Sequence, residues 1–497
     1  MVSSSISRKK IRKFGKRKTR RIQKKNRESE SHKIQGRRYQ KKNGWIRMQI
    51  WGNAFERGYA HGHLLSSELQ HIREVTLPFL VKTFQHISYE KYETTCHDQL
   101  YENIRTEYPE FFEEMTGIAA GCNLSFDFIL AWNSHLSMSN FFKHSEHKRS
   151  EFKNKNKTNH KKKHHGGGEN DGEEGRCSAF IAVGDATETG EIVMAHNTHS
   201  DFVSATTFNV ILEIDPQNQD SNKQKQKPKK IKMQTAPGFI ASGSDFFLCG
   251  SGIIGCETTI GKINYKPDFS YPKTPYFCRV RQAMQYADSL DEFVAYMKKG
   301  NAGDYACSWL LGHTEGKKQE IMLFELGLKT ENIERKTNGL FYGMNSAISP
   351  EIREKETTDI LFWDMMSPCG ARNIRFHFLL YEKYYGKINM VNARTILADH
   401  YDVFTNKETK GNGLTICRHA NLDPRIAASP RGAYYPWGCT DGKVVSSSMA
   451  KRGSFLGRWG PTCGHAFSAA AFLKQHPKYA KWEPVLPNMP TEPWINL

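Results

Sequence analysis

The chain has 497 residues and a net charge of +19, and it has no segment of about 18 apolar residues that would predict a membrane-spanning helix. Residues 1–43 contain 18 Lys and Arg against 2 Glu, so this segment carries +16 and the other 454 residues together carry only +3. The near-neutral body argues against a broad nucleic-acid-binding face.

Residues 1–43 are expected to form a disordered basic arm, because they combine high charge with few apolar side chains. Such an arm favours contact with nucleic acid or an anionic surface, and the alternative is a solvated tail. It has no apolar run of the kind found in a signal peptide, which favours an intracellular location. Because the core is expected to begin at Trp45, removal of the arm should leave thermal stability unchanged.

Eleven cysteines are present, an odd number, and none are spaced as a CxxC pair. An odd count without a secretory signal favours a reducing compartment. The spacing gives no reason to expect a structural zinc site, and no glycine-rich loop of the dinucleotide or P-loop type is found in its required context. We therefore expect neither a metal nor a cofactor.

Residues 44–142 are expected to form the N-terminal part of the folded domain. Apolar residues over 44–52 predict a strand, and helical periodicity continues from there to about Phe142. Gly58 and Gly62 would let a helix pack closely on a strand, and His61 between them is interpreted as a packed or capping histidine. Residues 143–176 are of low complexity and are expected to form a flexible loop.

Residues 177–497 are expected to form the main part of the same domain. A polar insert at 215–230 interrupts a predicted β-hairpin. The predicted elements are strands at 177–183, 191–195, 208–214, 231–234, 239–244, 246–259, 308–311 and 321–326, and helices at 276–286, 290–298, 372–385 and 392–402. The middle of the sequence is rich in predicted strands, and predicted helices precede and follow it. This order indicates a layered α+β domain.

Cys177 stands where the low-complexity loop meets the first of these strands. This position suggests that the chain cuts itself at Arg176–Cys177, giving associated fragments of 176 and 321 residues. The cut would place a thiol nucleophile and an α-amine base on one residue. His196 and Asn197, at the end of the next strand, could orient that amine, and Asn345 could donate to an oxyanion. The alternative is that Cys177 is a buried thiol and Asn345 a turn residue.

Other polar residues have weaker claims. Asp201 could orient the amine or be an exposed loop carboxylate. Arg372 and Arg375 could bind a substrate carboxylate or phosphate, although arginines at this spacing on a helix also suit a solvated face.

Two motifs in order resemble the phospholipase B-like family of N-terminal nucleophile (Ntn) hydrolases: Cys177-Ser178-Ala179 followed by Ala195-His196-Asn197-Thr198, and Glu257-Thr258-Thr259-Ile260-Gly261. Residues 52–62 and 303–309 also resemble the related acyl-coenzyme A:6-aminopenicillanate acyltransferase-like group. The resemblance extends over roughly residues 45–497. It implies a four-layer αββα sandwich and cleavage of ester or amide bonds to acyl groups.

The resemblance also implies roles for individual residues. Cys177 matches the nucleophile and Asn345 the oxyanion asparagine, and His196 with Thr258 or Thr259 matches polar residues of the pocket. His199 stands where the family has tryptophan, which would change the polarity of the acyl pocket. Family members in animals have a signal peptide, whereas this chain begins with the basic arm.

Two functions of different classes are therefore considered. The first is a self-processing cysteine hydrolase, or an acyltransferase of the same fold, acting on acyl-bearing, lipid-like substrates. The second is a non-catalytic protein that binds polyanions through residues 1–43. Cleavage near residue 176 would favour the enzyme.

Overall fold

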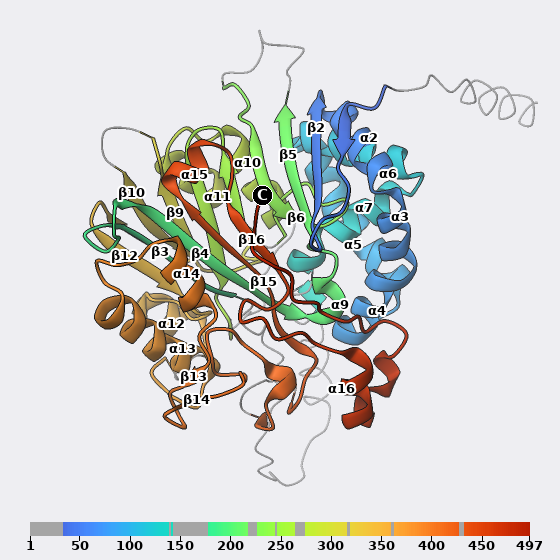
Figure 1. Ribbon diagram of the computed structural model, residues 1–497. Helices are drawn as coiled ribbons and strands as arrows, with labels where there is room; N and C mark the ends of the chain where they lie inside the picture. Colours follow the sequence, from blue (N-terminus) through green and yellow to red (C-terminus); the bar gives the residue numbers. More distant parts are fainter. Residues whose placement is uncertain are drawn as a thin grey trace, which may run out of the picture.

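The computed structural model describes residues 33–138, 141–142, 177–216, 226–243, 246–263, 274–315, 319–358, 362–426 and 432–497 (Figure 1). Two large sheets form its centre and helices lie outside them. The predicted α+β class is thereby confirmed. Arm residues 1–32 and the predicted loop 143–176, with the cleavage residue Arg176, lie outside the described residues. In the described part of the chain, no helix is both long and apolar enough to cross a membrane.

The larger sheet has nine strands in the order β1-β2-β5-β6-β7-β8-β9-β10-β11. All neighbours are antiparallel except β2 and β5, which run parallel. Its interior strand β8 is buried along its whole length, as expected for a strand covered on both faces. The strands are β1 (Gly36–Arg38), β2 (Ile46–Gly52), β5 (Val210–Pro216), β6 (Ile231–Thr235), β7 (Phe246–Cys249), β8 (Ile253–Thr259), β9 (Cys307–His313), β10 (Glu320–Leu326) and β11 (Glu331–Lys336).

The second sheet has six antiparallel strands in the order β12-β3-β4-β15-β16-β17. The strands are β12 (Gly339–Gly343), β3 (Cys177–Gly184), β4 (Gly190–Asp201), β15 (Trp437–Ser446), β16 (Leu456–Trp459) and β17 (Ile495–Asn496). A bulge between Cys439 and Asp441 shifts the register of β15 against β4. A separate two-stranded ribbon pairs β13 (Tyr401–Asp402) with β14 (Lys407–Glu408).

The two sheets pack face to face, with β3 against β8 and β9. At Gly312 of β9, an added Cβ would lie 3.2 Å from side-chain atoms of Ile181, Ile192 and Ile254, which come from both sheets. On the outer face of the smaller sheet, Phe180 and Ala195 pack in one apolar cluster with Phe376 and Leu397. The smaller sheet is thus covered by the other sheet on one side and by helices on the other.

Helices cover the outer faces of both sheets. The helices α10 and α11 contact β7, β9 and β10, whereas α14 contacts β4 and β15. The N-terminal helices gather beside β2 (Figure 1). The helices are α2 (Ala54–Leu64), α3 (Ser66–His71), α4 (Leu77–Leu80), α5 (Tyr89–Glu107), α6 (Pro109–Cys122), α7 (Phe126–Asn133), α9 (Phe202–Ala205), α10 (Tyr276–Tyr286), α11 (Leu290–Lys298), α12 (Pro350–Glu356), α13 (Pro368–His377), α14 (Met390–Leu397), α15 (Ser447–Lys451) and α16 (Ala469–Gln475).

Predictions about individual elements are corrected in several places. Residues 36–38, assigned to the disordered arm, form β1 and pair with β2, and Arg38 makes an ion pair with Glu68. Truncation after residue 43 would therefore remove an edge strand. The predicted helix at 392–402 also begins earlier and ends earlier, because Asn389 caps α14 and the chain extends into β13 at Tyr401. The predicted strand at 239–244 is wrong, because residues 239–243 form bends between β6 and β7.

Gly58 and Gly62 allow close packing, but of α2 against helix α6 rather than against a strand. A Cβ added at Gly58 would lie 2.0 Å from the carbonyl oxygen of Glu114, and one at Gly62 would lie 2.0 Å from that of Ile118. His61 is fully buried and accepts a hydrogen bond at Nε2 from the Gly238 amide, 2.9 Å away. Burial lowers the pKa of His61 to about 4, which agrees with its interpretation as a packed histidine.

A buried carboxylate joins α6 to α2 and α10. Glu114 accepts from Arg57 Nε at 2.6 Å and from both terminal nitrogens of Arg281 at 3.0 Å, and all three side chains are buried. Burial raises the pKa of Glu114, but Arg281 and Arg57 outweigh that effect, so the pKa lies below its usual value. The stabilisation is therefore present above the pKa of the unfolded state and is lost as the pH falls through that of the folded state.

Glu114→Gln is expected to lower the free energy of unfolding by about 3–5 kcal/mol, because it leaves the buried guanidinium group of Arg281 without its counter-ion and leaves Arg57 with Glu110 alone. Urea unfolding at neutral pH measures the difference. Glu102→Gln is the matched control, since Glu102 pairs with Arg105 at the surface and such a pair contributes about 0–1 kcal/mol. Equal effects of the two substitutions would contradict the assignment.

Candidate active site

Cys177 is the first residue of β3, and its backbone is held at both ends. Its amide nitrogen donates to Asn345 Oδ1 at 3.3 Å, and its carbonyl oxygen accepts from Arg372 Nη1 at 2.7 Å. The residue is 3 % exposed. Because Cys177 lies opposite Thr198 and alternates with Ser178, its side chain belongs to the face of β3 that meets the larger sheet. Two other segments thus fix the start of this strand.

Asn345 follows β12 and connects the ends of the two sheets. Its Nδ2 donates to the carbonyl oxygen of Thr259, at the end of β8, at 3.0 Å. Its φ of 75° lies in the left-handed region, which asparagine tolerates better than most residues. The amide therefore presents its oxygen to the Cys177 nitrogen and uses at least one N–H on the backbone of the opposite sheet.

Arg372 reaches the same point from α13. Its Nη2 donates to Asn345 Oδ1 at 2.9 Å and its Nη1 to Ser178 Oγ at 3.0 Å. Burial lowers the pKa of Arg372, and the neighbouring Arg418 lowers it further, to about 9, so the group keeps its charge at neutral pH. The solvated-face interpretation is wrong here: Arg372 is fully buried, and Arg375 makes a two-point ion pair with Asp399.

His196 and Asn197, predicted to lie at the end of a strand, are in the middle of β4, which continues to Asp201, and they point to opposite faces of the smaller sheet. His196 Nε2 donates to the carbonyl oxygen of Glu257 in β8 at 3.0 Å, and so connects the sheets. Burial lowers the pKa of His196 well below its usual value, with a further contribution from Lys443, so the ring is neutral. Asn197 points the other way and donates to the carbonyl oxygen of Leu397 at 2.8 Å. Of His196 and Asn197, only His196 therefore shares the face assigned to Cys177.

A buried polar network lies beside His196 on this face, and the sequence analysis did not identify it. Lys443 Nζ donates to Thr198 Oγ1 at 2.7 Å and to Asp441 Oδ1 at 2.5 Å, and Gln234 Nε2 donates to Asp441 Oδ2 at 2.9 Å. Lys443 and Asp441 are both fully buried. Two opposite charges at i and i+2 in an otherwise apolar strand are the signal that could have indicated a polar patch between the sheets.

The predicted pocket residues do not lie together. Thr258 faces the smaller sheet, because a Cβ added at Gly343 would lie 2.4 Å from its Oγ1, and this oxygen has no partner within the described residues. Thr259 points away and its hydroxyl lies 2.5 Å from that of Tyr305. His199 is fully buried on the outer face, 5.7 Å from Trp437 between ring centres. Of the three, only Thr258 faces the side of β3 assigned to Cys177.

Asp201 is not an exposed loop carboxylate. It is buried at the end of β4, accepts from the Ser204 amide at 2.8 Å and caps α9. The neighbouring His199 is neutral, like His196. Burial lowers the pKa of His199 well below its usual value, and Arg372 and Arg418 lower it further.

A separate pocket of about 620 Å³ lies at the other end of β8. It is lined by Gly252 and Ile254, together with charged residues such as Glu213 and Lys232, whereas the Cys177 cluster lies at the Thr259 end of the strand. The pocket contains none of the predicted catalytic residues.

Comparisons with known proteins agree on one family. The family model described as Phospholipase B matches residues 48–323. The chain is 24% identical over 299 residues to a phospholipase B of Crotalus adamanteus, an alignment that covers 56% of this chain and 50% of that protein. It is 31% identical over 143 residues to phospholipase-B 81 of Drysdalia coronoides, covering 28% of this chain and 25% of the relative. The chain thus matches half or less of the length of each relative.

Proposed function

Because the chain belongs to the phospholipase B family, we propose that it is an ester hydrolase of phospholipid-like substrates that uses Cys177 as an N-terminal nucleophile. The face-to-face sheets with helices outside suit the four-layer αββα sandwich of Ntn hydrolases. The observation that carries the proposal is the fixation of the Cys177 backbone by Asn345 and Arg372 at the edge of that sandwich.

Activation begins with cleavage of the Arg176–Cys177 bond. The Cys177 thiol adds to the carbonyl carbon of Arg176 and the C–N bond breaks, so that a thioester forms and the nitrogen takes up a proton to become the α-amine. Water then hydrolyses the thioester, which releases the Arg176 carboxylate and the free thiol. Asn345 Oδ1 accepts from this nitrogen before cleavage and holds the amine in the same place afterwards.

Ester hydrolysis reuses these groups. The α-amine takes the thiol proton, and the thiolate adds to the ester carbonyl. Collapse of the tetrahedral intermediate expels the alcohol, which receives the proton from the ammonium group and leaves an acyl thioester on Cys177. Water, deprotonated by the amine, then releases the fatty acid. Asn345, which has a second N–H besides the one bound to Thr259, donates to the oxyanion.

The rate should rise with pH through the pKa of the α-amine, since only the neutral amine acts as a base. An unperturbed α-amine has a pKa of about 7.7–8.0. The charged guanidinium of Arg372, bound to the carbonyl oxygen of the same residue, disfavours the ammonium form and should lower this value. A pH profile of kcat/KM should therefore show a single rise at or below pH ~8. A rate that does not change between pH 5 and pH 9 would contradict the amine as base.

The substrate class is tested with vesicles of phosphatidylcholine. Free fatty acid and water-soluble glycerophosphocholine should accumulate with wild-type protein and not with Cys177→Ala. Addition of a primary amine separates hydrolysis from acyl transfer, because a transferase would form the fatty amide in place of the acid. Absence of any acyl release from correctly cleaved protein, on both ester and amide substrates, would reject the hydrolase and favour a non-catalytic role.

A further inference from the structure

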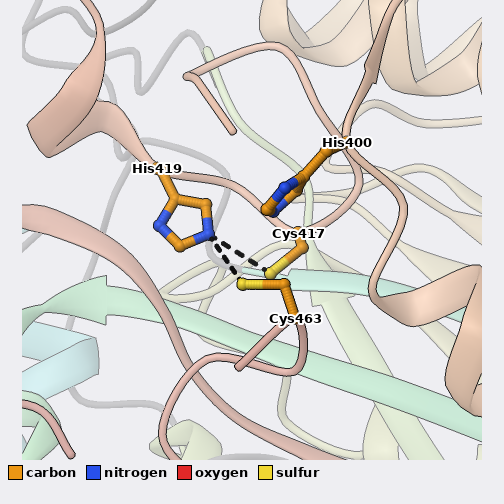
Figure 2. Close-up of side chains that lie close together, drawn as sticks. All are labelled: His400, Cys417, His419 and Cys463. Atoms are coloured by element: carbon orange, nitrogen blue, oxygen red, sulfur yellow. Dashed lines mark hydrogen bonds between the residues drawn. The ribbon is translucent and has the colours of Figure 1, made fainter. Parts of the chain in front are cut away.

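Two cysteines and two histidines meet outside the Cys177 cluster (Figure 2). His400, Cys417, His419 and Cys463 each offer one atom, and these four atoms all lie within 4.8 Å of one another. His419 Nε2 is 3.4 Å from Cys417 Sγ and 3.3 Å from Cys463 Sγ. We propose that these four side chains bind a Zn²⁺ ion in a tetrahedral, structural site.

The ligand set and its dimensions suit this ion. Two thiolates and two imidazoles form one of the usual sets of structural zinc sites, with Zn–S of about 2.3 Å and Zn–N of about 2.0 Å. In a tetrahedron these bond lengths separate the ligand atoms by about 3.3–3.8 Å. The two S···N separations of 3.4 and 3.3 Å match that range, and the remaining atoms need to move by about 1 Å or less.

The two imidazole rings are already arranged to share one ion. Their centres are 5.0 Å apart and their planes cross at 83°, so both can point a nitrogen at a common centre. His400 Nε2 is buried and has no hydrogen-bond partner within the described residues, which is costly for an enclosed polar atom. Gly411, with φ of 97°, leaves room for the rings: a Cβ there would lie 2.4 Å from His419 Cδ2 and 3.0 Å from His400 Nε2.

Supporting contacts hold the sulfur atoms in position. Thr462 Oγ1 donates to Cys417 Sγ at 3.3 Å, and the His465 amide donates to Cys463 Sγ at 3.3 Å. Such donors to a thiolate are typical of the surroundings of a metal site and stabilise its charge. Binding replaces the proton of each thiol by a bond to zinc, so that Zn²⁺ enters and two protons leave.

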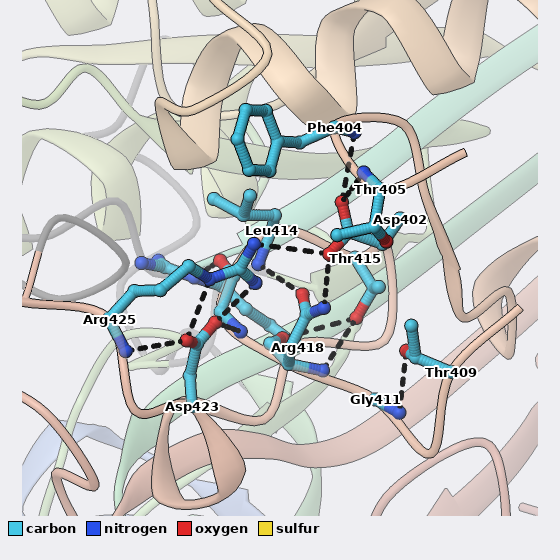
Figure 3. A network of polar contacts seen from close by, with 12 residues as sticks. Asp402, Phe404, Thr405, Thr409, Gly411, Leu414, Thr415, Arg418, Asp423 and Arg425 are labelled. Carbon is cyan, nitrogen blue, oxygen red and sulfur yellow. Dashed lines mark hydrogen bonds and ion pairs between the residues drawn. The ribbon is translucent and has the colours of Figure 1, made fainter. Parts of the chain in front are cut away.

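The segment that carries three of the ligands has little regular secondary structure. A polar network cross-links it (Figure 3): Asp402 Oδ2 accepts from Asn412 Nδ2 at 2.7 Å, Asp423 Oδ2 accepts from the Gly413 amide at 2.8 Å, and Arg425 donates to both carboxylates. A closed four-ligand site would add to this network the stabilisation that the segment lacks from helices and strands.

The site also adjoins the proposed active centre. The carbonyl oxygen of Ile416 accepts from Ser178 Oγ at 3.2 Å, and that of Leu397 accepts from Asn197 at 2.8 Å and lies 2.9 Å from Thr462 Oγ1. Bound zinc would thus support the outer face of β3 and β4 at Ser178 and Asn197, directly behind the inner face that carries Cys177 and His196.

The test is the zinc content of the purified full-length chain. The protein is expressed in medium that contains zinc and is dialysed without a chelator. Wild type should hold about one zinc per chain, and Cys463→Ser and His400→Ala should hold less than about a tenth of that. His377→Ala and Cys249→Ser are matched controls that should keep the metal, because His377 is exposed on α13 and Cys249 lies in β7. Equal zinc in wild type and in both ligand variants would overturn the proposal.

A second measurement does not depend on how the variants fold. Wild type reconstituted with Co²⁺ should show the intense visible bands of tetrahedral cobalt with thiolate ligands. Wild type that takes up no zinc and no cobalt would overturn the proposal. Mass spectrometry of peptides from the purified protein provides a further check. A disulfide bond between Cys417 and Cys463 would overturn the proposal as well.

Discussion

Cys177→Ala is expected to remain a single chain of 497 residues and to lose acyl-ester hydrolysis by at least about 10³-fold. The thiol is required twice in the account, first to attack the Arg176 carbonyl and then to attack the substrate. Wild type should give fragments of 176 and 321 residues that stay together after native purification, because β2 from the first fragment pairs with β5 from the second. Denaturing and native gels measure both results.

Cys249→Ala is the matched control for this substitution. Cys249 is also buried, but it lies in β7, and burial raises its pKa, as expected for an inert thiol. This variant should cleave itself and hydrolyse ester like wild type. A Cys177→Ala chain that is cut as fast as wild type would show that an external protease, rather than Cys177, makes the cut.

Asn345→Gly is expected to lower kcat by about 10²–10³ while the fold is kept, as for loss of an oxyanion donor. Glycine is chosen because the backbone at this position is left-handed, where alanine would add about 1–2 kcal/mol of strain. Single-turnover kinetics on cleaved protein separate this effect from any delay in self-cleavage, and thermal unfolding monitors the fold.

Asn345→Asp distinguishes the two roles of the amide. Aspartate keeps an oxygen for the Cys177 nitrogen and for Arg372 but cannot donate to an oxyanion or to Thr259. If Asn345 donates to the oxyanion, aspartate should be as slow as glycine. Near-normal turnover with aspartate would mean that Asn345 only positions the nucleophile.

The sequence was sufficient to predict elements whose residues carry a local pattern. The strands at 44–52 and 177–183 and the helices at 276–286 and 290–298 follow apolar periodicity and were predicted close to their observed bounds. The strand predicted at 191–195 is longer in the structure, because β4 continues through polar residues to Asp201. β1 was missed because its charged residues, Gly36-Arg37-Arg38, pair at the edge of the sheet and need no apolar face.

The sites show a different limit. Cys177, His196 and Thr258 were predicted as site residues because they belong to recognisable motifs, and the structure places them on the facing sides of the two sheets. The role of Arg372 depends on which side of α13 faces the smaller sheet, and spacing along a helix does not determine that. The cluster of His400, Cys417, His419 and Cys463 was missed because its residues are spread over 64 positions of the sequence and lack the short spacing of a zinc motif. Irregular segments bring them together only in the folded chain.

The central claim is that Cys177 becomes an N-terminal residue and carries the acyl group. The most direct test is the mass of the wild-type fragments after brief incubation with a phospholipid substrate and acid quenching, which preserves thioesters. The account predicts a 321-residue fragment that begins at Cys177, with one acyl group on that residue. A fully active chain that is uncut at residue 176, or an acyl group on a different residue, would contradict it.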